Sequence, residues 1–173
     1  MAKSANLRQF QEAILLKLKD ATAHGAVASS SRLGVMVANK RMLINLADMT
    51  ELLPMPPLQA VPLTQPWFLG VANIRGNLYN ISDLAQLMGL PPTPKSASNR
   101  IVLLNSEVTT QAALVVGSLI GLRGVDSMQV KKAAVAGEVL FSKQAFEDAD
   151  KNEWFELDIE ALMQDKNFIQ PTI

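Results

Sequence analysis

The most informative segment of this chain reads Pro66-Trp67-Phe68-Leu69-Gly70-Val71-Ala72-Asn73-Ile74-Arg75-Gly76-Asn77-Leu78-Tyr79-Asn80-Ile81-Ser82-Asp83-Leu84. Two apolar runs flank a short stretch, Arg75-Gly76-Asn77, in which Gly and Asn tolerate positive φ and can close a tight reversal. The segment therefore predicts a β-hairpin whose tip presents an Arg side chain. A short helix should follow at once, because Asp83 and Gln86 have capping-box spacing and Gly89 suits a helix end.

The overall composition predicts a folded protein that binds neither nucleic acid nor a charged membrane. The 173 residues suit one domain or two small barrels that share a core, and 49% of them are apolar. The formal net charge is zero, so the chain lacks the basic excess that attracts phosphates. There is no cysteine, which excludes disulfides and thiolate metal sites.

Neither the N-terminal segment nor the longest apolar run predicts export or membrane insertion. Met1 to Asp20 is polar with mixed charge and lacks the apolar core of a signal peptide. Ala112 to Leu122 is shorter than the about 20 residues that a membrane-spanning helix requires. We therefore expect a soluble, cytoplasmic protein.

Residues 1–32 are expected to form an amphipathic helix and a linker that precede a β-rich domain of residues 33–173. The helix either docks back on that domain or binds a partner; docking is the commoner use of such an apolar stripe. The apolar residues at helical spacing are Leu7, Phe10, Ile14 and Leu18.

From Leu33 onward, short apolar runs predict a mainly β domain, and their even spacing favours paired small barrels over a parallel α/β sheet. Two of these runs are rich in Val and Leu and should be buried on both faces, and the Gly-broken run after them should contain a bulge or bend. Beyond the opening hairpin, the expected strands are Val35–Ala38, Arg41–Asn45, Arg100–Asn105, Gln111–Ser118, Leu119–Val125, Met128–Val130, Val139–Ser142 and Trp154–Leu157.

Two further short helices are predicted from capping residues and apolar spacing. Asn45 would cap a helix over Leu46–Leu53, which would carry Met49 and Glu51. Asp158 would cap a helix near the C-terminus. Prolines and small polar residues over Pro91–Asn99 predict an internal linker.

A search for a catalytic set, a metal site or a cofactor site finds no convincing candidate. The single histidine, His24, lies in a small-residue linker, and Ser29 to Ser31 have no base arranged beside them. Glu147, Asp148, Asp150 and Glu153 are clustered, but they lack calcium-loop spacing and are expected to form a solvated acidic surface. We expect no enzyme activity and no cofactor.

The hairpin sequence Trp67-Phe68-Leu69-Gly70-Val71-Ala72-Asn73-Ile74-Arg75-Gly76, followed by Asp83-Leu84, resembles the signature of CheW-like domains. The wider match over Val61–Leu90 is similar to the branch of that family that serves the chemosensory system of type IV pili. The resemblance implies a mainly β fold of two small five-stranded, SH3-like barrels packed together. It also implies short helices, with the N-terminal helix as an addition.

The same resemblance implies an adaptor that binds two proteins. One is the regulatory domain of a CheA-type histidine kinase, and the other is the cytoplasmic tip of a chemoreceptor. The implied partner-binding residues are Arg75 of the hairpin, Met49 and Glu51 before it, and Asn73 of the motif. One departure stands out, because many CheW-like domains have Val-Asp where this chain has Val116-Gly117-Ser118.

Three functional hypotheses follow from the sequence. The leading one is a non-enzymatic adaptor that couples a methyl-accepting chemoreceptor to the kinase and so regulates twitching motility. A second is a CheV-like or kinase-borne module of the same fold. We expect the end of the chain at Ile173, with no receiver or kinase segment, to argue against this hypothesis. The alternative from another class is a small-ligand-binding β-barrel or a hydrolase that uses Ser29, Ser30 or His24.

Overall fold

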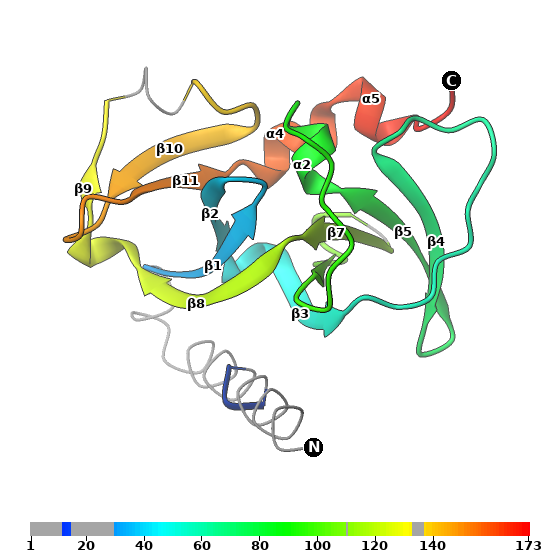
Figure 1. Cartoon of the computed structure of the whole chain (residues 1–173), viewed down its shortest axis with the longest axis horizontal. Helices are drawn as coiled ribbons and strands as arrows, with labels where there is room; N and C mark the ends of the chain where they lie inside the picture. The colour runs from blue at the N-terminus through cyan, green and yellow to red at the C-terminus, as the bar shows by residue number, and fades with distance from the viewer. Residues whose placement is uncertain (1–11, 15–29, 110, 133–136) are drawn as a thin grey trace.

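Two β-sheets packed against each other form the protein, with short helices at their junction (Figure 1). This computed structural model describes residues 12–14, 30–109, 111–132 and 137–173. The mainly β class and the paired small β units are as expected. Of the expected N-terminal helix, only residues 12–14 are described, and they are helical; His24 and Ser29 lie outside the described residues.

The first sheet contains six strands in the order β8-β1-β2-β11-β10-β9. The predicted hairpin at its centre is confirmed, because β1 and β2 pair antiparallel from Arg32↔Asn45 to Val37↔Lys40. The sheet has one strand more than the five expected, owing to the two-residue β9. Its strands are β1 (Ser31–Val37), β2 (Lys40–Asn45), β8 (Ser118–Gly124), β9 (Gln129–Val130), β10 (Ser142–Glu147) and β11 (Glu153–Leu157).

The second sheet contains five strands in the order β3-β6-β7-β5-β4, so β3 and β4 lie at its opposite ends. The predicted hairpin of the opening segment is confirmed as β4 and β5. The strands are β3 (Met49–Pro54), β4 (Phe68–Ile74), β5 (Asn77–Asp83), β6 (Arg100–Leu104) and β7 (Ala112–Val116).

Both predicted Asp caps are confirmed. The Oδ1 atoms of Asp83 and Asp158 accept hydrogen bonds from the backbone N–H groups of Ala85, at 3.1 Å, and Ala161, at 3.0 Å. No helix in the described ranges is long and apolar enough to cross a membrane. The helices are α2 (Leu84–Leu87), α4 (Ile159–Gln164) and α5 (Lys166–Ile169), with 3-10 turns η1 (Leu46–Asp48) and η2 (Val125–Ser127).

The predicted helix over Leu46–Leu53 is wrong. Asn45 does cap a helical turn, but that turn is only η1, and Met49–Pro54 forms strand β3 instead. Pairing with β6 buries Met49 and Leu52, and this long-range contact overrides the helical spacing of a short apolar run. The strand expected over Val139–Ser142 is also displaced, because β10 begins only at Ser142.

The two sheets share one apolar core. Several strands place the side chains of one face in this shared core and those of the opposite face in the interior of their own sheet. On β6, Val102 and Leu104 enter the shared core, whereas Ile101 and Leu103 enter the interior of the second sheet. Because strand side chains alternate between faces, a continuous apolar run can serve two cores at once. This confirms burial on both faces for the central parts of the two predicted runs, β6 (Arg100–Leu104) and β7 (Ala112–Val116), whereas Asn105 and Gln111 at their ends are not buried.

The chain passes between the sheets at two short crossings. η1 connects β2 to β3, and Gly117 alone separates β7 from β8. The Gly117 N–H donates to the carbonyl of Met36 at 2.8 Å, which fixes the second crossing to the first sheet. The bulge expected in the following strand is confirmed, since the β1–β8 register shifts between Gly34 and Val35.

The segment between β3 and β4 forms a strap along the outer edge of β4. Gln59 exchanges backbone hydrogen bonds of 2.8 and 2.9 Å with Val71. Further along, Thr64 pairs with Thr172, which ties the strap to the C-terminus. Gly70 permits this approach, because its φ is +131° and a Cβ there would lie 2.3 Å from the Gln59 carbonyl oxygen.

Replacing Leu114 by Ala should destabilise the whole protein. Leu114 is fully buried in the shared core, so its truncation should cost about 2–5 kcal/mol of unfolding free energy. Leu78→Ala is the matched control, since Leu78 is 57% exposed and should change stability by less than about 0.5 kcal/mol. Urea denaturation of both variants measures this; equal losses would contradict the shared core.

Replacing Gly70 by Ala should cost much more than replacing Gly76, although both glycines have positive φ. The added Cβ of Gly70→Ala meets backbone atoms of the strap, so we expect a loss of about 2 kcal/mol or more. The Cβ of Gly76→Ala meets nothing within 4 Å, so only the backbone penalty of about 1 kcal/mol remains. Thermal and urea unfolding compare the two, and a smaller loss at Gly70 would contradict the close approach.

Candidate partner-binding site

The hairpin tip is a two-residue turn formed by Arg75 and Gly76. Asn77 was expected in the turn, but it pairs with Ile74 and is the first residue of β5. Both turn residues have positive φ, 53° for Arg75 and 84° for Gly76, as a type I′ turn requires. Asn73 stabilises the turn, because its Oδ1 accepts a hydrogen bond of 2.9 Å from the Gly76 N–H.

Arg75 occupies a backbone conformation that Asn, Asp or Gly adopts more easily. A left-handed φ is uncommon for a residue with a long side chain, and such residues cluster at functional sites. The turn would form at least as well with Asn in this position. What the Arg adds to this turn is a long charged side chain, which the structure pairs with Glu51.

Arg75 forms a two-pronged ion pair with Glu51 of β3. Its Nη1 and Nη2 each donate a 2.5 Å hydrogen bond to one carboxylate oxygen. These hydrogen bonds and the Glu51 charge raise the pKa of Arg75 above its ordinary value, so the guanidinium stays charged. The side chain of Arg75 is 67% exposed and that of Glu51 is 19% exposed, so the cation faces solvent while the carboxylate is largely covered.

This ion pair joins the two ends of the second sheet. Glu51 lies on β3, and Arg75 follows directly on β4, the strand at the other end of the strand order. The sheet therefore curls until its end strands approach each other. Its interior contains Ala72 and Ile74 from β4, with Leu53 of β3 packed against the same cluster.

A bulge in β3 sets the positions of two predicted site residues. The register with β6 shifts between Met49 and Glu51, so Thr50 is the extra residue. Glu51 then lies opposite Leu103 at the margin of the second-sheet core, and Met49 lies opposite Leu104 in the shared core. Met49 is only 7% exposed, so the structure gives it a packing role and separates it from the surface formed by Arg75 and Glu51.

A shallow cleft of about 360 Å³ is lined by residues that are close in the sequence to Glu51 and Arg75. Thr50 adjoins Glu51, and Tyr79 lies on the hairpin strand that begins just after Arg75. Sequence reasoning missed both residues. A bulge cannot be read from one strand alone, because it depends on the pairing partner.

The acidic residues at the end of β10 and in the turn that follows it are held by hydrogen bonds and ion pairs. Glu147 pairs with Lys131 at 2.6 Å and with Lys151 at 3.2 Å. Asp148 accepts a hydrogen bond of 2.9 Å from Nε1 of the buried Trp154 and 2.9 Å bonds from two turn N–H groups. Within the described ranges, no group of three or more His, Cys, Asp or Glu side chains could hold a metal ion.

Asp148 should contribute to stability at neutral pH and lose that contribution in acid. The Trp154 hydrogen bond, above all, lowers the pKa of Asp148 from 3.8 to about 2. A depressed pKa favours the folded state above pH 3.8, and the benefit disappears as pH falls through about 2. Asp148→Asn should therefore be less stable than wild type at neutral pH, and the difference should shrink over that acid range.

Urea unfolding at several pH values measures this difference. Asp150→Asn is the matched control, because Asp150 is an exposed residue of the same turn and should leave the unfolding free energy nearly unchanged. A gap between wild type and Asp148→Asn that does not vary with pH would show that the ionised carboxylate is not responsible.

Two curated proteins are similar to this chain in sequence. The chain is 28% identical over 98 residues to Protein PilI of Pseudomonas aeruginosa and 24% identical over 126 residues to Chemotaxis protein CheV3 of Helicobacter pylori. These matches cover 57% and 70% of this chain, but only 54% and 40% of the relatives. The chain therefore spans about half the length of the curated relatives it matches.

A solved structure and a family model give the fold and the family. The crystal structure of the scaffolding protein TtCheW from Thermoanaerobacter tengcongensis matches with a TM-score of 0.67 at 16% identity. That match covers 80% of this chain and 94% of the solved one, which shows a common fold. The model of the CheW-like domain matches residues 32–167. The chain thus belongs to the CheW-like domain family, and its resemblance is to the PilI type.

Proposed function

We propose that this protein is a non-enzymatic adaptor of a type IV pilus chemosensory system. It couples the cytoplasmic tip of a methyl-accepting chemoreceptor to the regulatory domain of a CheA-type histidine kinase, in the cytoplasm beneath the inner membrane. One observation carries the proposal: a CheW-like domain presents an exposed, permanently charged Arg75 on a rigid two-residue turn.

The relatives support this role without establishing it for this chain. Two of them are named as a chemotaxis protein and a scaffolding protein. Similarity to PilI supports a pilus system in preference to a flagellar one. The match to the CheW-like domain covers residues 32–167, which include nearly all of the described β-strands.

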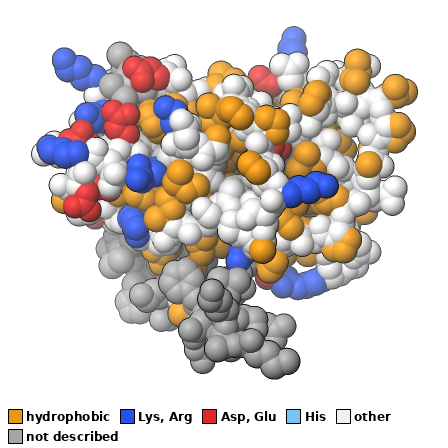
Figure 2. All heavy atoms as spheres, viewed as in Figure 1, with side chains coloured by type: hydrophobic (Ala, Val, Ile, Leu, Met, Phe, Trp, Pro, Cys, Tyr) orange, Lys and Arg blue, Asp and Glu red, His pale blue; other side chains and the backbone are white. Residues whose placement is uncertain are grey.

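The surface of the molecule is suited to a protein partner. Figure 2 shows hydrophobic side chains gathered at the right of the view and Lys, Arg, Asp and Glu side chains concentrated at the left. A receptor tip is a helical hairpin, and a helix binds by laying an apolar face in a groove while charges at the rim set its orientation. Arg75 would be such a rim charge, held in place by Glu51.

The packing of the second sheet disfavours the ligand-binding barrel as an alternative. Its interior is filled by side chains, among them Ile81, Ile101 and Val115, which are at most 1% exposed. A ligand in that interior would have to displace them. The interior of the first sheet is likewise occupied, by Leu43, Phe146 and Trp154.

Co-purification tests the proposal as a whole. The full chain should bind a receptor cytoplasmic fragment and the kinase regulatory domain with dissociation constants of tens of micromolar or lower, roughly the range of reversible signalling contacts. Absence of binding to both partners at that concentration would refute the adaptor function.

Arg75→Glu should weaken receptor binding by about tenfold or more, because a rim charge is reversed opposite its partner. The unfolding midpoint should change little, since Arg75 is mostly exposed. Isothermal titration with the receptor fragment and thermal unfolding give the two readouts. Lys95→Glu provides the same charge change at another exposed residue and should leave receptor binding intact.

A charge swap distinguishes recognition from a purely structural role. The double variant Glu51→Arg with Arg75→Glu restores an ion pair across the same two strands but reverses its polarity. If the receptor recognises the Arg75 cation, the swap should keep the unfolding midpoint of the wild type but leave receptor binding as weak as in Arg75→Glu. Return of receptor binding to the wild-type level would assign the pair to closure of the sheet alone.

A further inference from the structure

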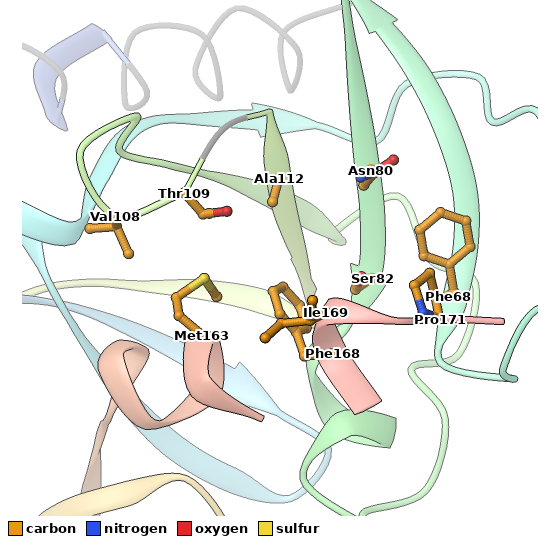
Figure 3. A pocket seen from close by; sticks show the side chains of 10 residues that line it. All are labelled: Phe68, Asn80, Ser82, Val108, Thr109, Ala112, Met163, Phe168, Ile169 and Pro171. Atoms are coloured by element: carbon orange, nitrogen blue, oxygen red, sulfur yellow. The ribbon is translucent and has the colours of Figure 1, made fainter. Parts of the chain in front are cut away.

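A second cleft lies between the second sheet and the C-terminal helices (Figure 3). Its volume is about 320 Å³. One side is formed by Phe68 of β4 and by Asn80 and Ser82 of β5, and the other by Met163 of α4 and Phe168 of α5. No role has been assigned to it in the adaptor function proposed above.

The floor of this cleft contains a buried polar group that has no partner. Asn80 and Ser82 are two residues apart on β5 and so point to the same face of the sheet. Ser82 is only 3% exposed, and its hydroxyl makes no hydrogen bond within the part of the chain that the structure describes. A buried hydroxyl without a partner is costly, so a ligand that supplies one would be favoured.

The aromatic and proline side chains in the walls of the cleft are held in place by neighbouring residues. Phe168 stacks on Trp67 with ring centroids 6.1 Å apart, and Trp67 also meets Phe68 edge to face at 6.2 Å. Pro171 is fixed because its carbonyl accepts a 2.6 Å hydrogen bond from the Gln65 N–H of the strap. Two aromatic rings and a proline thus line a cavity whose shape does not depend on a ligand.

The size and charge of the cleft limit what can occupy it. A volume of 320 Å³ corresponds to roughly ten water molecules at about 30 Å³ each, the lower end of the range for ligand pockets. None of the ten lining residues is charged, so an ionised ligand would lose its hydration without a compensating partner.

From these observations we infer that the cleft is a binding site for a small uncharged molecule with an aromatic body and one hydrogen-bonding group. The aromatic body packs between Phe68 and Phe168, and the polar group pairs with Ser82 and Asn80. Because Phe168 and Ile169 of α5 and Pro171 form part of the wall, a bound molecule would join the C-terminus more firmly to the second sheet.

Titration of the full chain with p-cresol, followed by amide chemical shifts in NMR spectra, tests this inference. Saturable shifts should be confined to Ser82, Thr109, Ile169 and their neighbours, with a dissociation constant of about 1 mM for so small a probe. Toluene, which lacks the hydroxyl, should bind about tenfold more weakly. Shifts that do not saturate, or that spread through the core, would overturn the inference.

Three variants make the test specific. Ser82→Ala should abolish the preference for p-cresol over toluene while preserving the fold, because the oxygen removed has no partner among the described residues. Thr109→Trp should fill the cleft and weaken p-cresol binding at least tenfold. Glu107→Trp, at an exposed position of the same loop outside the cleft, should not. Equal binding by both Trp variants would refute the site.

N-acetyltyrosinamide is a further probe, which distinguishes a free small molecule from a tyrosine side chain of a partner protein. Binding no tighter than that of p-cresol supports a free small molecule. Binding at least tenfold tighter would overturn that assignment in favour of a tyrosine side chain of a partner protein. These experiments involve neither Arg75 nor Glu51, so the adaptor function and this cleft can fail independently.

Discussion

The structure depends on one packing constraint: the two small sheets bury their facing sides in a single apolar core to which both contribute side chains. Strands β2, β6, β7 and β11 each place some side chains in the shared core and others in the interior of their own sheet. A strand covered on both faces has no free surface on which to slip by one residue, because every side chain would enter the wrong core. The register of both sheets is therefore fixed by the same contacts.

The exposed features gain their rigidity from this arrangement. The hairpin that carries Arg75 belongs to a sheet whose central strands are buried on both faces, so its tip is held by the core and not by local turn preference alone. The turn places an Arg where Asn would fit more easily, and Glu51 compensates by binding the side chain from the far end of the sheet. Local strain and a long-range ion pair thus coincide at one exposed position.

Local signals in the sequence predicted much of the fold. The capping carboxylates Asp83 and Asp158 and the turn at Gly76 act through neighbours a few residues away, so they can be read from the sequence directly. The helix expected over Leu46–Leu53 failed because its spacing fits a helix while its burial comes from β6, fifty residues later. Met49, which the family resemblance implied as a partner-binding residue, lies on strand β3 and is buried.

The candidate site was predicted only in part, for the same reason. That Arg75 and Glu51 act together followed from family resemblance, since nothing in either residue's neighbourhood signals the other. The uncharged cleft was not foreseen at all, because it joins β4 and β5 to residues at the opposite end of the chain. Asn80 and Ser82, polar residues that alternate along β5 toward its buried C-terminal end, were the available sign.

The strap along β4 has a consequence for the behaviour of the protein at high concentration. An unpaired end strand is a template on which a second molecule can add its own strand, the first step toward aggregation. Gln59 occupies the backbone groups of Val71 that such a strand would use, and Thr64 anchors the strap to Thr172. Copies of this protein can therefore be crowded together with this edge of the sheet protected from strand exchange.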